Sequence, residues 1–94
     1  MSKIADLLAT AHQGDAQAQY ELGWAYMKGE GIKPDLIEAY FWLCLANRST
    51  GIFWSPSPDE LMEEIARKIS GPEVHRAVTR AMEWFDRHQS HGAK

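Results

Sequence analysis

The chain has 94 residues and carries ten lysines and arginines against thirteen aspartates and glutamates, a formal net charge of −3. This length fits one domain, and the acidic balance gives no electrostatic reason to expect binding to nucleic acid or to an anionic membrane. With 45% hydrophobic residues, 24% charged residues and one cysteine, the composition is that of a globular chain without an internal disulfide framework.

The longest apolar stretch covers residues 36–46 and is interrupted only by Glu38. A helix of that length measures about 16 Å, roughly half of what a bilayer requires, so the stretch predicts a core helix. Residues 1–14 lack the basic start and unbroken apolar run of a signal peptide. These features, with the lone Cys44, predict a cytoplasmic protein that makes no use of a membrane.

The first two predicted helices are amphipathic. Residues with helical spacing define the first, which ends near Gly14: Ile4, Leu7, Leu8 and Ala11. Asp15 is the expected N-cap of the second helix, which runs to about Lys28. Its buried face is expected to consist of Ala18, Leu22, Ala25 and Tyr26.

Asp35 and Glu38 have the spacing of a capping box and predict a third helix from Asp35 to about Arg48. Its apolar residues, which include Phe41 and Trp42, are distributed around the whole helix. Such a helix must be covered on more than one face, so we expect it at the centre of the fold.

Two further helices follow a loop over residues 47–57. Ser57, Pro58 and Glu60 mark the start of the fourth, and Ser70 with Glu73 marks the start of the fifth. The fourth is expected to bury Leu61, Met62, Ile65, Ala66 and Ile69. The fifth is expected to bury Val74, Ala77, Val78, Ala81, Met82 and Phe85. Because alternating strand patterns are absent, we predict an all-α fold of about five helices in antiparallel pairs.

A tetrad with alanine first and tryptophan last occurs at residues 39–42 and returns at residues 81–84. Residues 14–47 also have a characteristic order of small, aromatic and glycine positions. It comprises Gly14, Asp15, Ala16, Ala18, Tyr20, Leu22, Gly23, Tyr26, Gly29, Gly31, Ile32, Asp35, Ala39, Trp42 and Ala46. This pattern resembles one complete Sel1-like repeat, a relative of the tetratricopeptide repeat, in the style of bacterial members.

The resemblance implies an α-solenoid that acts as a non-catalytic module for protein–protein interaction. Residues 1–94 would form one domain: a partial preceding unit at 1–13, the full repeat at 14–48, a terminal helix pair at 57–88 and a tail at 89–94. Where the family has a short glycine connection, this chain inserts residues 48–58. Solenoid units bury their apolar faces against neighbours, so edge surfaces are expected to be covered by a partner or by self-association.

Candidate chemistry is sparse, and we expect no enzyme activity, cofactor or metal. Cys44 lies between leucines, an environment that disfavours a reactive thiolate. His88 and His91 have ligand-like spacing but lie in a polar segment without further ligands nearby, since His75 is more than three turns away. The sequence Gly29–Glu30–Gly31 is too short and too acidic to hold a phosphate group.

The aromatic residues are more informative. Trp42 and Trp84 occupy the packing position of the repeat and are expected in the core. Trp24 falls at a position that the repeat leaves free, as do Glu21 and Lys28. Because first helices line the concave face of such repeats, we predict that Tyr20, Glu21, Trp24 and Lys28 bind a partner protein or peptide.

Two alternatives remain open at this point. Trp24 could instead pack against the N-terminal helix, which would leave no exposed anchor. Phe53 and Trp54 in the inserted loop could fold back over the third helix or contact another chain. The second option would suit a self-associating structural subunit, a homodimer; a small ligand-binding protein or enzyme is the least favoured alternative.

Overall fold

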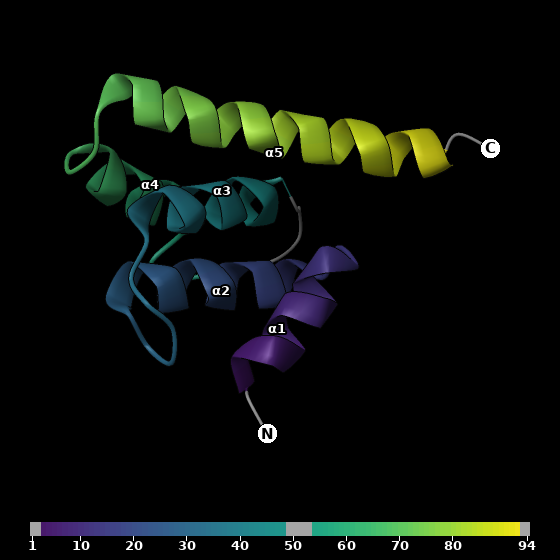
Figure 1. The fold of residues 1–94 in the computed structure, drawn as a ribbon, viewed down its shortest axis with the longest axis horizontal. Helices are drawn as coiled ribbons and strands as arrows, with labels where there is room; N and C mark the ends of the chain where they lie inside the picture. Colours follow the sequence, from purple (N-terminus) through teal and green to yellow (C-terminus); the bar gives the residue numbers. More distant parts are fainter. Residues whose placement is uncertain (1–2, 49–53, 93–94) are drawn as a thin grey trace.

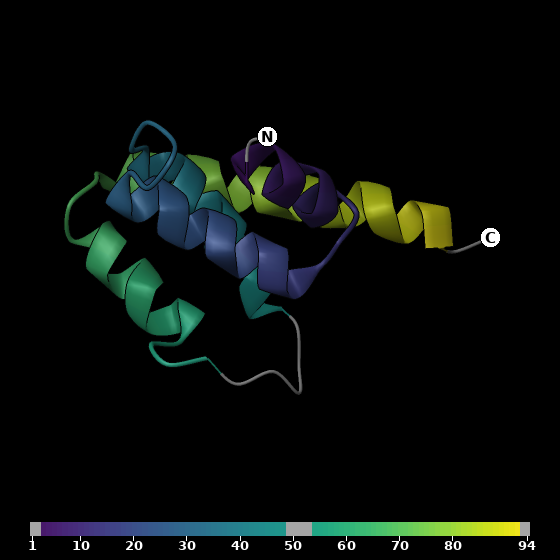
Figure 2. The same ribbon diagram turned by 90° about the horizontal axis from the view of Figure 1, so that it is seen from below.

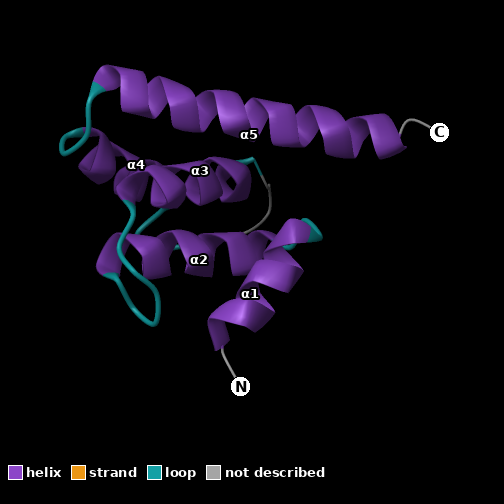
Figure 3. Ribbon diagram, viewed as in Figure 1, coloured by secondary structure: helices purple, strands orange, loops and turns teal. Residues whose placement is uncertain are grey.

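The computed structural model describes residues 3–48 and 54–92, with side chains as far as His88. These ranges contain the helices α1 (Lys3–His12), α2 (Ala16–Lys28), α3 (Leu36–Asn47), α4 (Pro58–Ala66) and α5 (Gly71–Gly92). No strand occurs within them (Figure 3), so the predicted all-α fold is confirmed. α2 and α3 run antiparallel, and α5 lies along α3 on the side away from α2 (Figure 1).

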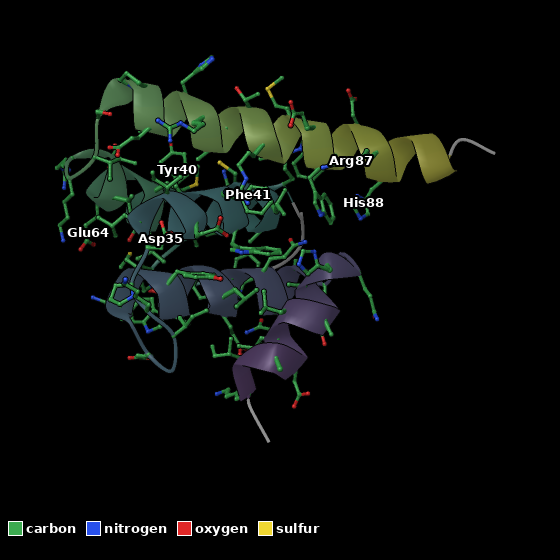
Figure 4. All side chains as sticks on the ribbon, in the orientation of Figure 1. Asp35, Tyr40, Phe41, Glu64, Arg87 and His88 are labelled. Atoms are coloured by element: carbon green, nitrogen blue, oxygen red, sulfur yellow. The ribbon has the colours of Figure 1, made fainter. Side chains whose placement is uncertain are left out.

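α3 is the central helix, as its apolar residues predict. It contacts α2, α4 and α5, whereas α1 packs against α2. Two core clusters meet on it. Phe41, Trp42 and Leu45 belong to the first, which also includes residues of α1, α2 and α5. Ala39 and Leu43 belong to the second, which continues into α4 through Leu61 and Ile65. Figure 4 shows Phe41 on α3, beneath α5.

The helix starts are formed by the predicted caps. Asp15 accepts a hydrogen bond from the backbone N–H of Ala18 at 3.0 Å. Ser57 Oγ accepts one from the N–H of Glu60 at 3.2 Å, with Pro58 in the first turn. Each cap satisfies a backbone donor that the helix itself cannot satisfy, so these starts are fixed locally.

The cap of α3 differs from the predicted reciprocal box. Asp35 Oδ1 accepts hydrogen bonds from the N–H groups of Ile37 and Glu38, each at 3.1 Å. The Glu38 carboxylate instead accepts a hydrogen bond from Arg80 of α5 at 2.6 Å. The same guanidinium lies 4.2 Å from the ring centroid of Phe41. Arg80 therefore joins α5 to α3.

Two burial expectations about the C-terminal helices need correction. Ala66, expected to be buried on the fourth helix, is exposed, and Met82, predicted to point inward, is 62% exposed. Among the side chains of α5 as far as His88, the buried ones are Ala77 and Ala81, and a residue five positions after Ala77 lies about 140° around the helix from it. α4 and α5 each contact α3 more extensively than they contact each other. α3 offers apolar surface on several sides, whereas α4 and α5 each have one stripe.

α5 continues to Gly92, beyond the point where the sequence predicted a polar tail. Its C-terminal turns extend past the end of α3 in both views (Figures 1 and 2). Within the described ranges, no helix combines the length and the apolar character needed to cross a membrane.

The capping box of α5 makes the stability of the fold depend on the protonation of the Glu73 carboxylate. The Ser70 N–H donates to Glu73 Oε1 at 2.8 Å, and the Glu73 N–H donates to Ser70 Oγ at 3.3 Å. The hydrogen bond from the Ser70 backbone, and next the one involving the Ser70 side chain, lower the pKa of Glu73. Because the folded-state pKa is the lower one, this stabilisation is present above the ordinary glutamate pKa of about 4.3. It is lost as the pH falls through the folded-state value.

We expect Glu73→Gln to reduce the acid sensitivity of the fold, since glutamine keeps an acceptor but cannot be protonated in this range. Thermal melts at a series of pH values would compare the variant with the wild type. The stability difference between the two should be largest above about pH 5 and should shrink toward about pH 3. Glu83→Gln removes the same charge from an exposed site on α5. Identical pH profiles for the two variants would contradict the assignment.

Candidate functional site

A groove with a volume of about 640 Å³ lies beside α2. In Figure 1, α1 and the connection over residues 29–35 both extend from α2 on the side away from α5, and both contribute to the groove. Helix α2 forms the middle of its wall. The lining residues from α2 are Tyr20, Glu21, Trp24 and Ala25, and those from α1 are Lys3, Ile4 and Leu7.

Three of the four predicted binding residues line this groove. Tyr20 and Trp24 are one turn apart on α2, which places their rings on the same face, and Glu21 lies beside them. The fourth residue, Lys28, is exposed and does not line the groove, but its Nζ lies 5.1 Å from the centroid of the Trp24 ring. The structure therefore brings all four side chains to one surface of α2.

Trp24 is packed on one side and accessible on the other. It is half-buried, packs against the second core cluster and also lines the groove. The core cluster that it packs against is formed by α3 and α4, whereas the sequence offered the N-terminal helix as the alternative packing partner. A tryptophan fixed on one side and accessible on the other is a rigid aromatic surface that needs little ordering when a partner binds.

The segment over residues 54–56 closes one side of the groove. The rings of Trp54 and Tyr20 are stacked with centroids 4.7 Å apart, and Trp54 Nε1 donates a hydrogen bond to Gln17 Oε1 at 3.1 Å. The Tyr20 hydroxyl donates to the carbonyl of Pro56 at 2.7 Å. Burial, and secondarily the charge of Glu60, raise the pKa of Tyr20, which keeps the phenol protonated as a donor.

Trp54 therefore lies on α2 and not over the third helix, one of the two positions that the sequence left open. The reason is that Tyr20 offers a flat, half-buried ring, whereas the apolar faces of α3 are already covered by three other helices. Phe53, the other aromatic residue of this loop, lies outside the described residues.

The α1 side of the groove is held by a buried polar contact. Gln19 is 3% exposed, and its Nε2 donates a hydrogen bond to the carbonyl of Ala11 at 3.1 Å, which ties α2 to the end of α1. Gly31 approaches from the other side, since a Cβ at this residue would lie 3.4 Å from Cγ1 of Ile4. Its φ of +75° favours glycine, so this residue type lets the connection reach α1.

Sequence reasoning missed the parts of the groove that come from connections. Glu30 and Gly31 were interpreted only as the loop of the repeat, and Ser55 and Pro56 only as loop residues, yet all four line the groove. Ile4 was assigned to the core, and it both packs on the first cluster and lines the groove. The partial amphipathicity of α1 was the one signal available, because the paths of the connections depend on tertiary structure.

The residues considered for chemistry lie elsewhere. Burial raises the pKa of the half-buried Cys44 to about 11, so its thiol is protonated at neutral pH. Trp84, predicted in the core, is only partly buried, and its ring stacks on that of His88 with centroids 3.5 Å apart. Within residues 3–48 and 54–88, no three histidine, cysteine, aspartate or glutamate side chains are grouped so as to hold a metal ion.

Comparison with known proteins gives one match. Residues 16–49 match the family model of the Sel1 repeat, which covers roughly a third of the chain. Comparisons with curated proteins and with solved structures yield no significant match. Sel1 repeats are tetratricopeptide-like helix pairs that generally mediate protein–protein interaction. The matched residues are those of α2, its glycine-containing connection and α3, and the chain therefore contains a Sel1 repeat.

Proposed function

We propose that the protein is a non-catalytic binding module that holds a peptide segment of a partner protein in the groove beside α2. The observation that carries this proposal is the placement of Trp24, which is fixed by the second core cluster and open to the groove. Tyr20 and Glu21 lie on the same wall, and Lys28 covers part of the indole. Aromatic anchors in concave sites are typical of peptide-binding surfaces.

The size and lining of the groove support this proposal. A volume of about 640 Å³ suits one or two large side chains of a bound segment. Ile4, Leu7 and Trp24 supply apolar surface, while Glu21 and Lys3 supply charged groups at its edge. This combination of an apolar floor and a few polar groups gives both affinity and orientation.

Trp24→Ala is expected to abolish most of the binding while the helices persist. Loss of a central aromatic anchor weakens binding by at least about tenfold. Peptides selected on the wild-type chain from an unbiased display library provide the ligands. Their affinity for the wild type and the variant can be measured by calorimetry, and circular dichroism reports the helical content.

Met82→Ala is the matched control, because it removes a large exposed side chain that does not line the groove. It should leave both affinity and helical content unchanged. Equal affinity of the selected peptides for the wild type and Trp24→Ala would contradict the proposal. Unfolding of Trp24→Ala would instead show that the residue acts mainly in the core. In that case, NMR spectra of the wild type with labelled indole groups decide whether the groove binds peptide, because a bound peptide should shift the indole resonance of Trp24.

A self-associating subunit is the second candidate, and the exposure of Met82 favours it. A side chain of this size that is 62% exposed offers an apolar contact on α5. Trp54 no longer supports this candidate, because its ring is stacked on Tyr20 of the same chain. Light scattering during size-exclusion chromatography distinguishes the two. A stable dimer that dissociates on Met82→Lys, together with no peptide binding that depends on Trp24, would favour self-association over the peptide groove.

A further inference from the structure

We propose that the segment held in the groove is basic, with one large apolar side chain beside Trp24 and flanking arginines or lysines paired with carboxylates at the groove edge. This inference rests on the proposed function and adds the chemistry of the partner. It is argued from the charged side chains that surround the groove, because the apolar anchor Trp24 alone does not specify the charge of the partner.

A second, smaller hollow of about 210 Å³ lies next to the groove, between α1 and the start of α2. The two hollows share Lys3, Leu7 and Glu21, so they adjoin along α1 and α2. Four acidic side chains and one basic side chain line the two hollows. The acidic residues are Asp6, Asp15, Glu21 and Glu30, and the basic residue is Lys3.

The acidic residues come from different segments of the chain. Glu21 lies on α2 and lines both hollows, and Gln17 Nε2 donates a hydrogen bond to its Oε2 at 2.9 Å, which orients the carboxylate. Glu30 lies on the connection after α2 and lines the larger hollow, and Asp6 lies on α1 and lines the smaller one. A segment that places an apolar side chain beside Trp24 therefore meets a surface to which α1, α2 and the connection after α2 each contribute a carboxylate.

Trp24 itself favours a cation. The Lys28 ammonium already lies over its ring, 5.1 Å from the centroid. The face of an indole attracts positive charge, so a bound arginine would stack on this ring by displacing the Lys28 ammonium. The apolar part of an arginine or lysine side chain also packs well along Ile4 and Leu7, so the apolar floor and the acidic edge select the same residue types.

Other occupants fit less well. An acidic segment or a nucleic acid would bring negative charge toward four carboxylates, within the distance over which salt does not fully screen them. A second copy of this chain carries a net charge of −3 and has the same unfavourable sign. Charge complementarity therefore points to a basic polypeptide segment.

The test uses the 94-residue chain and peptides selected on it from an unbiased display library. We expect the selected peptides to be enriched in arginine and lysine on both sides of a large apolar residue. The double variant Glu21→Gln/Glu30→Gln should bind them about threefold to tenfold more weakly, and added salt should weaken wild-type binding more than variant binding. The control Glu63→Gln/Glu83→Gln removes the same charge from exposed positions on α4 and α5 and should bind as the wild type does.

The outcomes separate this inference from the proposed function. Peptides that depend on Trp24 but lack basic residues, or that bind both double variants equally, overturn the basic partner and leave the peptide groove intact. If no selected peptide depends on Trp24, both proposals fail. A dimer that forms through the groove, detected by light scattering and abolished by Trp24→Ala, would identify a second copy as the occupant and also overturn the inference.

Discussion

Trp42→Ala is expected to destabilise the fold by about 3–5 kcal/mol, the usual cost of removing a fully buried large aromatic side chain. Trp42 is 2% exposed and belongs to the first core cluster, which includes residues of α1, α2, α3 and α5. Its ring meets that of His12 edge-on with centroids 5.1 Å apart and that of Phe41 at 5.0 Å. A chain of 94 residues has a total stability of about 5–14 kcal/mol, so this loss removes about a fifth of it or more.

Denaturant titration and thermal melts measure the effect, and the melting temperature should fall by at least about 12 °C. Met82→Ala, which truncates an exposed side chain, should stay within about 0.5 kcal/mol of the wild type. Trp42→Phe provides a second comparison, because the buried Trp42 Nε1 has no hydrogen-bond partner among the residues that the structure describes. Phenylalanine removes this unpaired donor and should cost less than half as much as alanine. A Trp42→Ala variant as stable as Met82→Ala would contradict the packing assignment.

The features that sequence predicted well are set by neighbours in the chain. Asp15 and Ser57 cap α2 and α4 through backbone N–H groups three residues away, and Asp35 caps α3 through groups two and three residues away. The even distribution of apolar residues on α3 likewise predicted its central position, because no other arrangement buries all of its faces. The predicted binding residues on α2 share a face for the same reason, since helical spacing alone brings Tyr20 and Trp24 together.

The features that sequence missed depend on contacts between distant segments. The pairing of Arg80 with Glu38 joins residues 42 positions apart, and it replaced a capping interaction that spacing favoured. The ring of Trp54 stacks on that of Tyr20, 34 positions earlier in the chain, and does not lie over the third helix. Glu30 and Pro56 became groove residues only because two connections approach α1 and α2. The charge, hydropathy and spacing of residues carry no information about where a connection runs in the folded chain.

Gly23→Ala is expected to destabilise the repeat although alanine is the better helix former. A Cβ at this position would lie 2.6 Å from Cγ and 2.7 Å from Cδ2 of Leu43, and 3.4 Å from the carbonyl oxygen of Ala39. Leu43 is fully buried in the second cluster, so its side chain has no free space to enter. The overpacking should cost about 1–3 kcal/mol and force α2 and α3 apart.

Gly71→Ala is the matched control because a Cβ at that residue, in the first turn of α5, would meet no atom within 4 Å. Helix propensity favours alanine here, whereas Pro72 at the next position disfavours a Cβ on residue 71 in the helical conformation, so stability should stay within about 1 kcal/mol of the wild type. The two substitutions add the same methyl group to helical glycines, so a larger loss of stability for Gly23→Ala in denaturant titration isolates the close approach of α2 to α3. A Gly23→Ala chain as stable as Gly71→Ala would contradict the close packing of α2 on α3. Because Trp24 is the next residue on α2, a shift of that helix should also weaken peptide binding in the groove, whereas Gly71→Ala should not.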